Sequence, residues 1–137
     1  MVKLDEQIQI LDFPDLGDER GNLVVVEGGS AIPFEIKRIF YIYGSDDEVV
    51  RGMHANLRSE FVMINVSGTS RVKVDNGSET RIIELNRPRM GLYLKNMVWK
   101  EMYDFSPDSV LLVLSNEHYD PEEYIRSYED YLKMVVK

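Results

Sequence analysis

The sequence predicts an all-β fold, a jelly roll or β-barrel of antiparallel strands that ends in one C-terminal α-helix. Three observations predict it. Roughly nine or ten short strand-like runs recur about every 8–12 residues. The tripeptide Asp75-Asn76-Gly77 is a strong signal for a β-hairpin turn. Only the last residues of the chain change to helical periodicity.

The expected strands are short runs of alternating or β-branched residues, separated by Gly, Asn, Asp, Ser or Pro. In chain order they cover 7–13, 22–27, 34–43, 61–66, 70–74, 80–85, 93–94, 98–105 and 110–114. The runs FVMINV and VLLVL are apolar on both faces. This pattern indicates a sheet that is covered on both sides, either by a second sheet or by a partner subunit.

The predicted helix begins after Asp120, which is a good N-cap, with Pro121 in the first helical position and Glu123 three residues after the cap. Apolar and aromatic residues then recur at helical spacing: Tyr124, Ile125, Tyr128, Tyr131, Leu132 and Val135. We expect a helix of about three to four turns that packs this face on the barrel. We interpret its tyrosines as packing residues.

The composition excludes several classes of protein. The 137 residues suit one domain, and their net charge of −8 disfavours binding to duplex nucleic acid or to an anionic membrane. There is no cysteine, no run long enough to span a membrane and no signal-peptide pattern, so we expect a cytoplasmic protein. Residues 37–100 nevertheless hold 11 basic and 7 acidic side chains. This local excess fits either ordinary surface charge or a site for a small anion.

The chemistry-bearing residues centre on His54, because the chain has only two histidines and His118 reads as structural. On a strand, the side chains of His54 and Asn56 point to the same face. Cupin barrels place metal ligands with a His-x-His spacing, but here the second position is Asn56, and Lys100 lies where a later ligand is expected. An ammonium and an amide are poor ligands for a divalent metal. We therefore expect no metal at this site.

Six blocks of sequence resemble the TDP-4-keto-6-deoxyglucose 3,4-ketoisomerases, a cupin-type family with a WxcM-like domain. The resemblance runs from about residue 7 to residue 134, and its blocks are DERGNL (18–23), IPFEIKR (32–38), RGMHA (51–55), GLY (91–93), VWKEMYDF (98–105) and YD…YIRSY (119–128). Each block alone is weak. Six in this order, at compatible spacing, are specific for the fold and the family.

The resemblance implies one cupin-like domain over residues 1–137, which forms a homodimer by exchanging N-terminal strands. It implies an isomerase that moves the carbonyl of a TDP-linked 4-keto-6-deoxyhexose from C4 to C3 through an enediol, by acid/base catalysis and without a cofactor. Such an enzyme would serve the biosynthesis of unusual deoxy and amino sugars for surface glycans such as the O-antigen of lipopolysaccharide.

The resemblance also assigns roles to residues. His54 falls on the first histidine of the family's paired motif and is the expected base. Arg20 and Arg51 would face the diphosphate or the sugar, and Tyr41 would donate to a sugar oxygen or relay a proton. Taken from the residues alone, Arg51 also fits a surface cation and Tyr41 a packed strand aromatic.

Three positions depart from the family pattern. Asn56 replaces the second histidine, and its amide can bind an enediolate but cannot act as a base. Phe61 replaces a glutamine in the pocket wall, and Lys100 stands where histidine or arginine is usual. Lys100 can bind phosphate or the enediolate, or act as a base if burial lowers its pKa. These changes leave an alternative, a cupin-like homologue that binds nucleotide sugars with altered or no activity because it lacks the second catalytic histidine.

Overall fold

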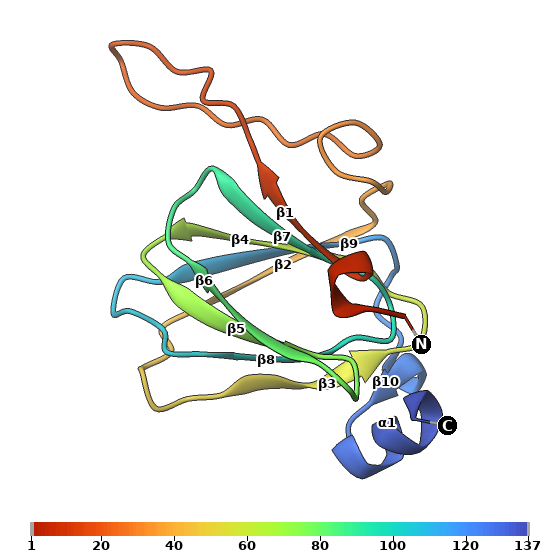
Figure 1. Ribbon diagram of the computed structural model, residues 1–137. Helices are drawn as coiled ribbons and strands as arrows, with labels where there is room; N and C mark the ends of the chain where they lie inside the picture. The colour runs from red at the N-terminus through yellow and green to blue at the C-terminus, as the bar shows by residue number, and fades with distance from the viewer. Residues whose placement is uncertain (1, 137) are drawn as a thin grey trace.

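Two five-stranded antiparallel sheets face each other across an apolar core in the computed structural model, which describes residues 2–136 (Figure 1). The first sheet has the strand order β1 (Ile8–Asp12), β7 (Met90–Leu94), β4 (Phe61–Ser67), β9 (Val110–Ser115) and β2 (Arg38–Tyr43). The second has the order β10 (Tyr124–Ile125), β3 (Arg51–Asn56), β8 (Trp99–Tyr103), β5 (Ser70–Asp75) and β6 (Thr80–Leu85). This confirms the predicted all-β, cupin-like architecture.

Side chains from both sheets alternate into the space between them and form the main core. Phe61 and Met63 of β4 are among its buried members, together with Leu92 of β7 and Val72 and Val74 of β5. The alternate residues of β4, Val62 and Ile64, belong to a second apolar cluster on the outer face of the first sheet. The double-sided apolar pattern of this strand is therefore explained by two cores, one on each face.

The hairpin predicted at Asp75-Asn76-Gly77 is confirmed. Strands β5 and β6 pair in register from Ser70 with Leu85 to Asp75 with Thr80. The Asp75 carboxylate accepts a hydrogen bond from the Gly77 N–H, and Gly77 has a φ of 95°, a value that favours glycine. The turn chemistry visible in the sequence thus determines this connection.

The prediction of a strand at 22–27 is wrong, because these residues do not belong to a sheet strand. The strand predicted at 34–43 begins only at Arg38. The segment between β1 and β2, here called the arm, extends away from the barrel and then returns along the outer face of the first sheet (Figure 1). Val24, Val26 and Ile36 pack against the outer cluster of the first sheet, where Phe34 is buried. Their apolar alternation serves this packing and not a ladder of hydrogen bonds, which explains why the sequence pattern resembled a strand.

The C-terminal helix is shorter than predicted. Asp120 caps only a 3-10 turn, η2 (Pro121–Glu123), after which the chain adds the short strand β10 to β3. The helix α1 (Tyr128–Val135) begins later, and its N-cap Ser127 accepts a hydrogen bond from the Asp130 N–H. The second short 3-10 turn, η1 (Leu4–Glu6), precedes β1.

The interpretation of the helix tyrosines as packing residues is confirmed for Tyr131. Its side chain is fully buried, its ring centroid lies 5.7 Å from that of Trp99, and its hydroxyl donates to the Met97 carbonyl oxygen at 2.9 Å, with the Asp75 carbonyl oxygen as an alternative acceptor at 3.1 Å. None of the helices within residues 2–136 has the length and apolar character needed to cross a bilayer.

Candidate active site

A cavity of about 480 Å³ opens between the two sheets, beside the exposed edge of β2. This volume is within the range typical of sites for small organic ligands. Its lining comes from β2, the loop before β3, β3, β4, β8 and the segment around β10: Phe40, Tyr41, Ile42, Val49, Val50, Arg51, Gly52, His54, Phe61, Met63, Lys100, Met102, Tyr124 and Arg126. Five of the seven residues predicted for the site, Tyr41, Arg51, His54, Phe61 and Lys100, are among them.

A β-bulge in β3 sets the direction of His54. Arg51 pairs with Met102 and Gly52 with Glu101, but the next pair is His54 with Lys100, so Met53 is the extra residue. Gly52 has a φ of 84° and Met53 a φ of 55°. An inserted residue reverses the alternation of a strand. The bulge therefore places Arg51 and His54 on the same, cavity-facing side, although they are three positions apart.

His54 is half-buried and is held in its uncharged form. Burial is the main cause that lowers the pKa of its imidazole to about 4, and the positive charge of Lys100 lowers it further. The ring lies 4.7 Å from the Tyr124 ring, and Nδ1 has no hydrogen-bond partner among the described residues. Near pH 7 the residue is a neutral imidazole, which is able to accept a proton.

Lys100 lies beside His54 at the inner end of the cavity, and only 2% of its surface is exposed. Its Nζ donates to Asn56 Oδ1 at 3.0 Å and lies 4.6 Å from the centroid of the Phe61 ring. Burial lowers the pKa of this amine from 10.5 to about 7, and the negative charge of Glu123 opposes part of that shift. Lys100 is therefore poised to exchange a proton near neutral pH.

Asn56 accepts a hydrogen bond from Lys100 and lies next to a buried polar cluster behind the cavity wall. Its side chain is fully buried, and its Nδ2 finds no partner among residues 2–136. Behind it, the carboxylate of Glu123 accepts hydrogen bonds from the backbone N–H groups of Arg58 and Ser59 and from the Ser59 hydroxyl. Burial by itself would raise the pKa of Glu123, but these donors outweigh it and keep the pKa below its ordinary value.

Arg51 lies at the outer part of the cavity, whereas Tyr41 borders the cavity from the outward-facing row of β2. Arg51 is exposed, as a cation at the mouth of an anion site would be. Tyr41 is on the outward row of β2 with Ile39 and Tyr43, is 61% exposed, and stacks on Tyr43 with ring centroids 6.2 Å apart. The inward position next to it is occupied by Phe40, which packs on Phe61.

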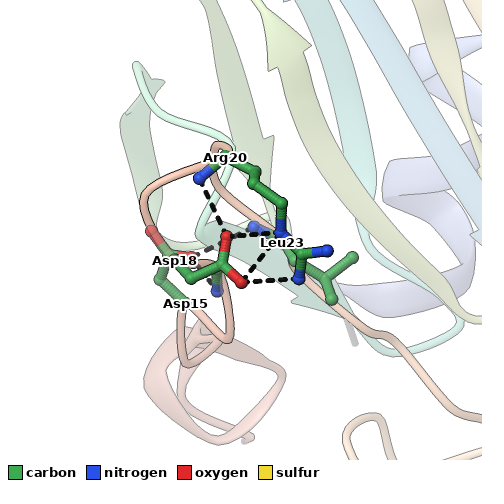
Figure 2. A network of polar contacts seen from close by, with 5 residues as sticks. Asp15, Asp18, Arg20 and Leu23 are labelled. Atoms are coloured by element: carbon green, nitrogen blue, oxygen red, sulfur yellow. Dashed lines mark hydrogen bonds and ion pairs between the residues drawn. The ribbon is translucent and has the colours of Figure 1, made fainter.

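The structure does not bring Arg20 to the cavity of its own chain. Figure 2 shows it in the arm, where its guanidinium forms an exposed ion pair with Asp18 at 2.6 Å. Asp15 holds the same loop by accepting hydrogen bonds from the backbone N–H groups of Gly17 and Leu23. The charge of Arg20 thus stabilises a local turn in the single chain.

Three residues near the cavity were not predicted as site residues, because the sequence after Asp120 has a helical pattern. Tyr124 and Arg126 alternate on an extended segment, and Tyr124 pairs with Asn56. Arg126 adds a second cation at the cavity and lies over the Tyr124 ring at 4.6 Å. Glu123 does not cap the turn with its side chain as predicted, because that side chain binds the 58–59 backbone.

The geometry combines a neutral imidazole and a lysine with a pKa near neutrality, between an apolar wall and two arginines. Such a set can move protons on an anionic organic substrate away from bulk water. Within residues 2–136 there is no group of three or more His, Asp or Glu side chains suited to hold a metal ion.

Comparison with known proteins identifies close relatives. Residues 6–136 match the family model described as FdtA, WxcM-like, C-terminal. The chain is 40% identical over 129 residues to the TDP-4-oxo-6-deoxy-alpha-D-glucose-3,4-oxoisomerase of Aneurinibacillus thermoaerophilus, which covers 94% of this chain and 93% of that protein.

Solved structures of sugar ketoisomerases are also similar over nearly the whole chain. The sugar 3,4-ketoisomerase QdtA from Thermoanaerobacterium thermosaccharolyticum, in complex with TDP, matches with a TM-score of 0.92, 40% identity and 94% coverage of both chains. WlaRA, a TDP-fucose-3,4-ketoisomerase from Campylobacter jejuni, matches with a TM-score of 0.89, 43% identity, and coverage of 93% of this chain and 95% of that one.

Proposed function

The chain belongs to the FdtA, WxcM-like family, and from this premise we propose that it is an isomerase that moves the carbonyl of a TDP-linked 4-keto-6-deoxyhexose from C4 to C3. The single observation that carries the proposal is the pairing of His54 with Lys100 inside the cavity of a chain that matches named 3,4-ketoisomerases over nearly its full length.

The reaction is internally balanced and requires only proton carriers. The C3–H bond breaks and its proton goes to a base, while O4 gains a proton and the enediol forms. In the second half, C4 gains a proton and O3–H loses one, which leaves the carbonyl at C3. Nothing is oxidised or reduced overall, because the two carbons exchange oxidation states.

We assign the carbon protons to His54. Its imidazole is neutral near pH 7 and lines the cavity. The exposed cations Arg51 and Arg126 are placed to bind the diphosphate, and an arginine–phosphate pair is a strong charge-assisted hydrogen bond. The apolar ring of Phe61 forms the inner wall and excludes water from the reacting carbons.

We further propose that two copies form a homodimer by exchanging their N-terminal strands, in the cytoplasm of the cell. The arm between β1 and β2 extends away from its own barrel (Figure 1). The outer row Ile39, Tyr41 and Tyr43 of β2 leaves an apolar and aromatic surface exposed beside the cavity. An exchanged arm would bring Arg20 toward the partner's cavity, which explains why it lies far from its own.

The experiment that tests the function is incubation of the protein with TDP-4-keto-6-deoxyglucose in deuterated water, followed by proton NMR. We expect deuterium to replace the C3 proton of the remaining substrate, and the carbonyl to migrate to C3 with deuterium at C4 of the product. If neither occurs while TDP binds by calorimetry, the isomerase proposal is refuted and the protein is a binding homologue. We further propose that its TDP-3-keto product is used by enzymes that build deoxy or amino sugars for surface glycans.

A further inference from the structure

We propose that Lys100 is a catalytic residue that exchanges protons with the two sugar oxygens, while His54 exchanges protons with the two carbons. The inference rests on the proposed ketoisomerase function and deepens it. It assigns to Lys100 the task that a second imidazole would otherwise perform, at a site where the sequence offers Asn56 instead of a histidine.

The position of Lys100 carries the argument. It is the direct cross-strand partner of His54, both side chains line the same cavity, and the amine is almost completely buried. Cross-strand partners on one face have Cβ atoms about 4.5–5.5 Å apart. The two proton carriers are therefore close enough to serve adjacent atoms of one sugar ring.

The surroundings of the Lys100 amine make the loss of its proton easy. Among residues 2–136 no carboxylate lies within ion-pair distance of Nζ, and its one short hydrogen bond goes to the neutral Asn56 Oδ1 at 3.0 Å. The Val98 carbonyl is a weak second acceptor at 3.5 Å. A buried ammonium with so few partners is costly, which makes release of the proton easy.

The groups around Lys100 come from every element packed against it. β3 contributes His54 and Asn56, and η2 contributes the carboxylate of Glu123 behind the wall. β4 contributes the Phe61 ring and β5 contributes Val74, both apolar. Glu123 is the one acidic group among them, and it is already held by its own donors, so it moderates the charge of Lys100 without trapping it.

These positions define a catalytic cycle. In the free enzyme His54 is neutral and Lys100 is an ammonium. The ammonium gives a proton to O4 as His54 takes the proton from C3, and the enediol forms. The resulting amine then takes the proton from O3 as the imidazolium of His54 returns its proton to C4. Both residues end in their starting forms, so the cycle is closed.

The cycle predicts a bell-shaped pH dependence of kcat/KM, which reports the free enzyme. The acid limb reflects His54 with a pKa of about 4, and the alkaline limb reflects loss of the Lys100 ammonium, with a pKa of about 7. Activity therefore falls as the pH rises through 7. An enzyme that used His54 alone would have no limb there.

The decisive variant is Lys100→Arg, which keeps the positive charge but cannot release a proton near neutral pH. We expect carbonyl migration to fall by about 10²–10⁴-fold, whereas deuterium exchange at C3 continues because His54 and a cation are still present. Lys95→Arg is the matched control, on an exposed lysine outside the cavity. Circular dichroism and the melting temperature verify that each variant is folded.

A second variant, Asn56→Asp, tests the same idea in the opposite direction. A carboxylate in contact with Nζ stabilises the ammonium, so the alkaline limb of kcat/KM is expected to move to higher pH. In Lys100→Arg the alkaline limb is expected to disappear.

The outcomes separate the two proposals. A wild-type protein that shows neither exchange nor migration refutes the ketoisomerase function itself. Active wild-type protein together with unchanged migration in Lys100→Arg, equal loss of exchange and migration in that variant, or an unmoved alkaline limb in Asn56→Asp overturns the assignment of Lys100.

Discussion

Replacing Lys100 with methionine is expected to stabilise the fold at neutral pH. The pKa of the amine is about 7 in the folded chain, against 10.5 for an ordinary lysine, and the cause is burial. Linkage then predicts that at pH 7 the folded state is penalised by about 4 kcal/mol relative to an unperturbed lysine. Methionine fills a similar volume and does not bear this penalty.

One lost interaction offsets part of this gain. Without Nζ, the buried Asn56 Oδ1 loses its donor at 3.0 Å, which costs about 1–3 kcal/mol. The net stabilisation of Lys100→Met at pH 7 is therefore about 1–3 kcal/mol. Between pH 7 and pH 10.5 the unfolded lysine binds more protons than the folded one, so the wild-type protein gains stability as the pH rises. By pH 10 the penalty has fallen to about 1 kcal/mol, and the advantage of the variant disappears.

The measurement is denaturant-induced unfolding of both proteins at one protein concentration, at pH 7, 8, 9 and 10. The difference between the two proteins removes the contribution of all other titrating groups. A difference in unfolding free energy that does not depend on pH would refute the reasoning, because it would mean that Lys100 keeps an ordinary pKa in the folded chain. A variant that is less stable than wild type at pH 7 would refute it as well.

Three further predictions follow from the site. His54→Asn is expected to abolish both C3 exchange and carbonyl migration while the melting temperature stays near that of wild type, and unchanged turnover in the NMR assay would exclude His54 as the base. Glu123→Gln is expected to lose about 1–3 kcal/mol of unfolding free energy, because the amide oxygen can keep the two backbone hydrogen bonds at Oε1 but the amide nitrogen cannot accept the Ser59 hydroxyl bond at Oε2; the exposed control Glu122→Gln is expected to change it by less than about 0.5 kcal/mol, and equal effects of the two would contradict this role. Arg20→Ala subunits mixed with His54→Asn subunits are expected to regain activity if arms are exchanged, since one cavity of a mixed dimer has both wild-type residues; activity that stays at the level of the separate variants would count against the exchange.

The strand predicted in the arm shows why local sequence patterns can mislead. Residues 22–27 have the β-branched composition of a strand, but their side chains use it to pack on the outside of a sheet. The same composition satisfies both arrangements, because a strand and an extended packed segment share the same alternation. The hydrogen-bond partners that distinguish them lie far away in the sequence.

The prediction of a helix directly after Asp120 is wrong for a related reason. The capping signal is real, and the Asp120 carboxylate accepts from the Glu122 N–H, but it supports only a single 3-10 turn. Pairing of β10 with β3 then interrupts the helical pattern before α1 begins at Tyr128. Tertiary strand pairing thus overrides local helical periodicity, and in doing so it places Tyr124 and Arg126 at the cavity.

The sequence by itself determined the all-β architecture, the hairpin at Asp75-Asn76-Gly77 and the family, and it singled out His54 as the candidate base, because strand period, turn chemistry and motif order are local properties of the chain. Only the tertiary structure decided that a bulge at Met53 turns His54 toward Lys100, and that Lys100 is buried beside Asn56 with Glu123 behind it. The charge state of a lysine depends on the solvent and the partners around its amine. The burial and the partners of the Lys100 amine result from the packing of β3, β4, β8 and η2, and these elements come from separate parts of the sequence.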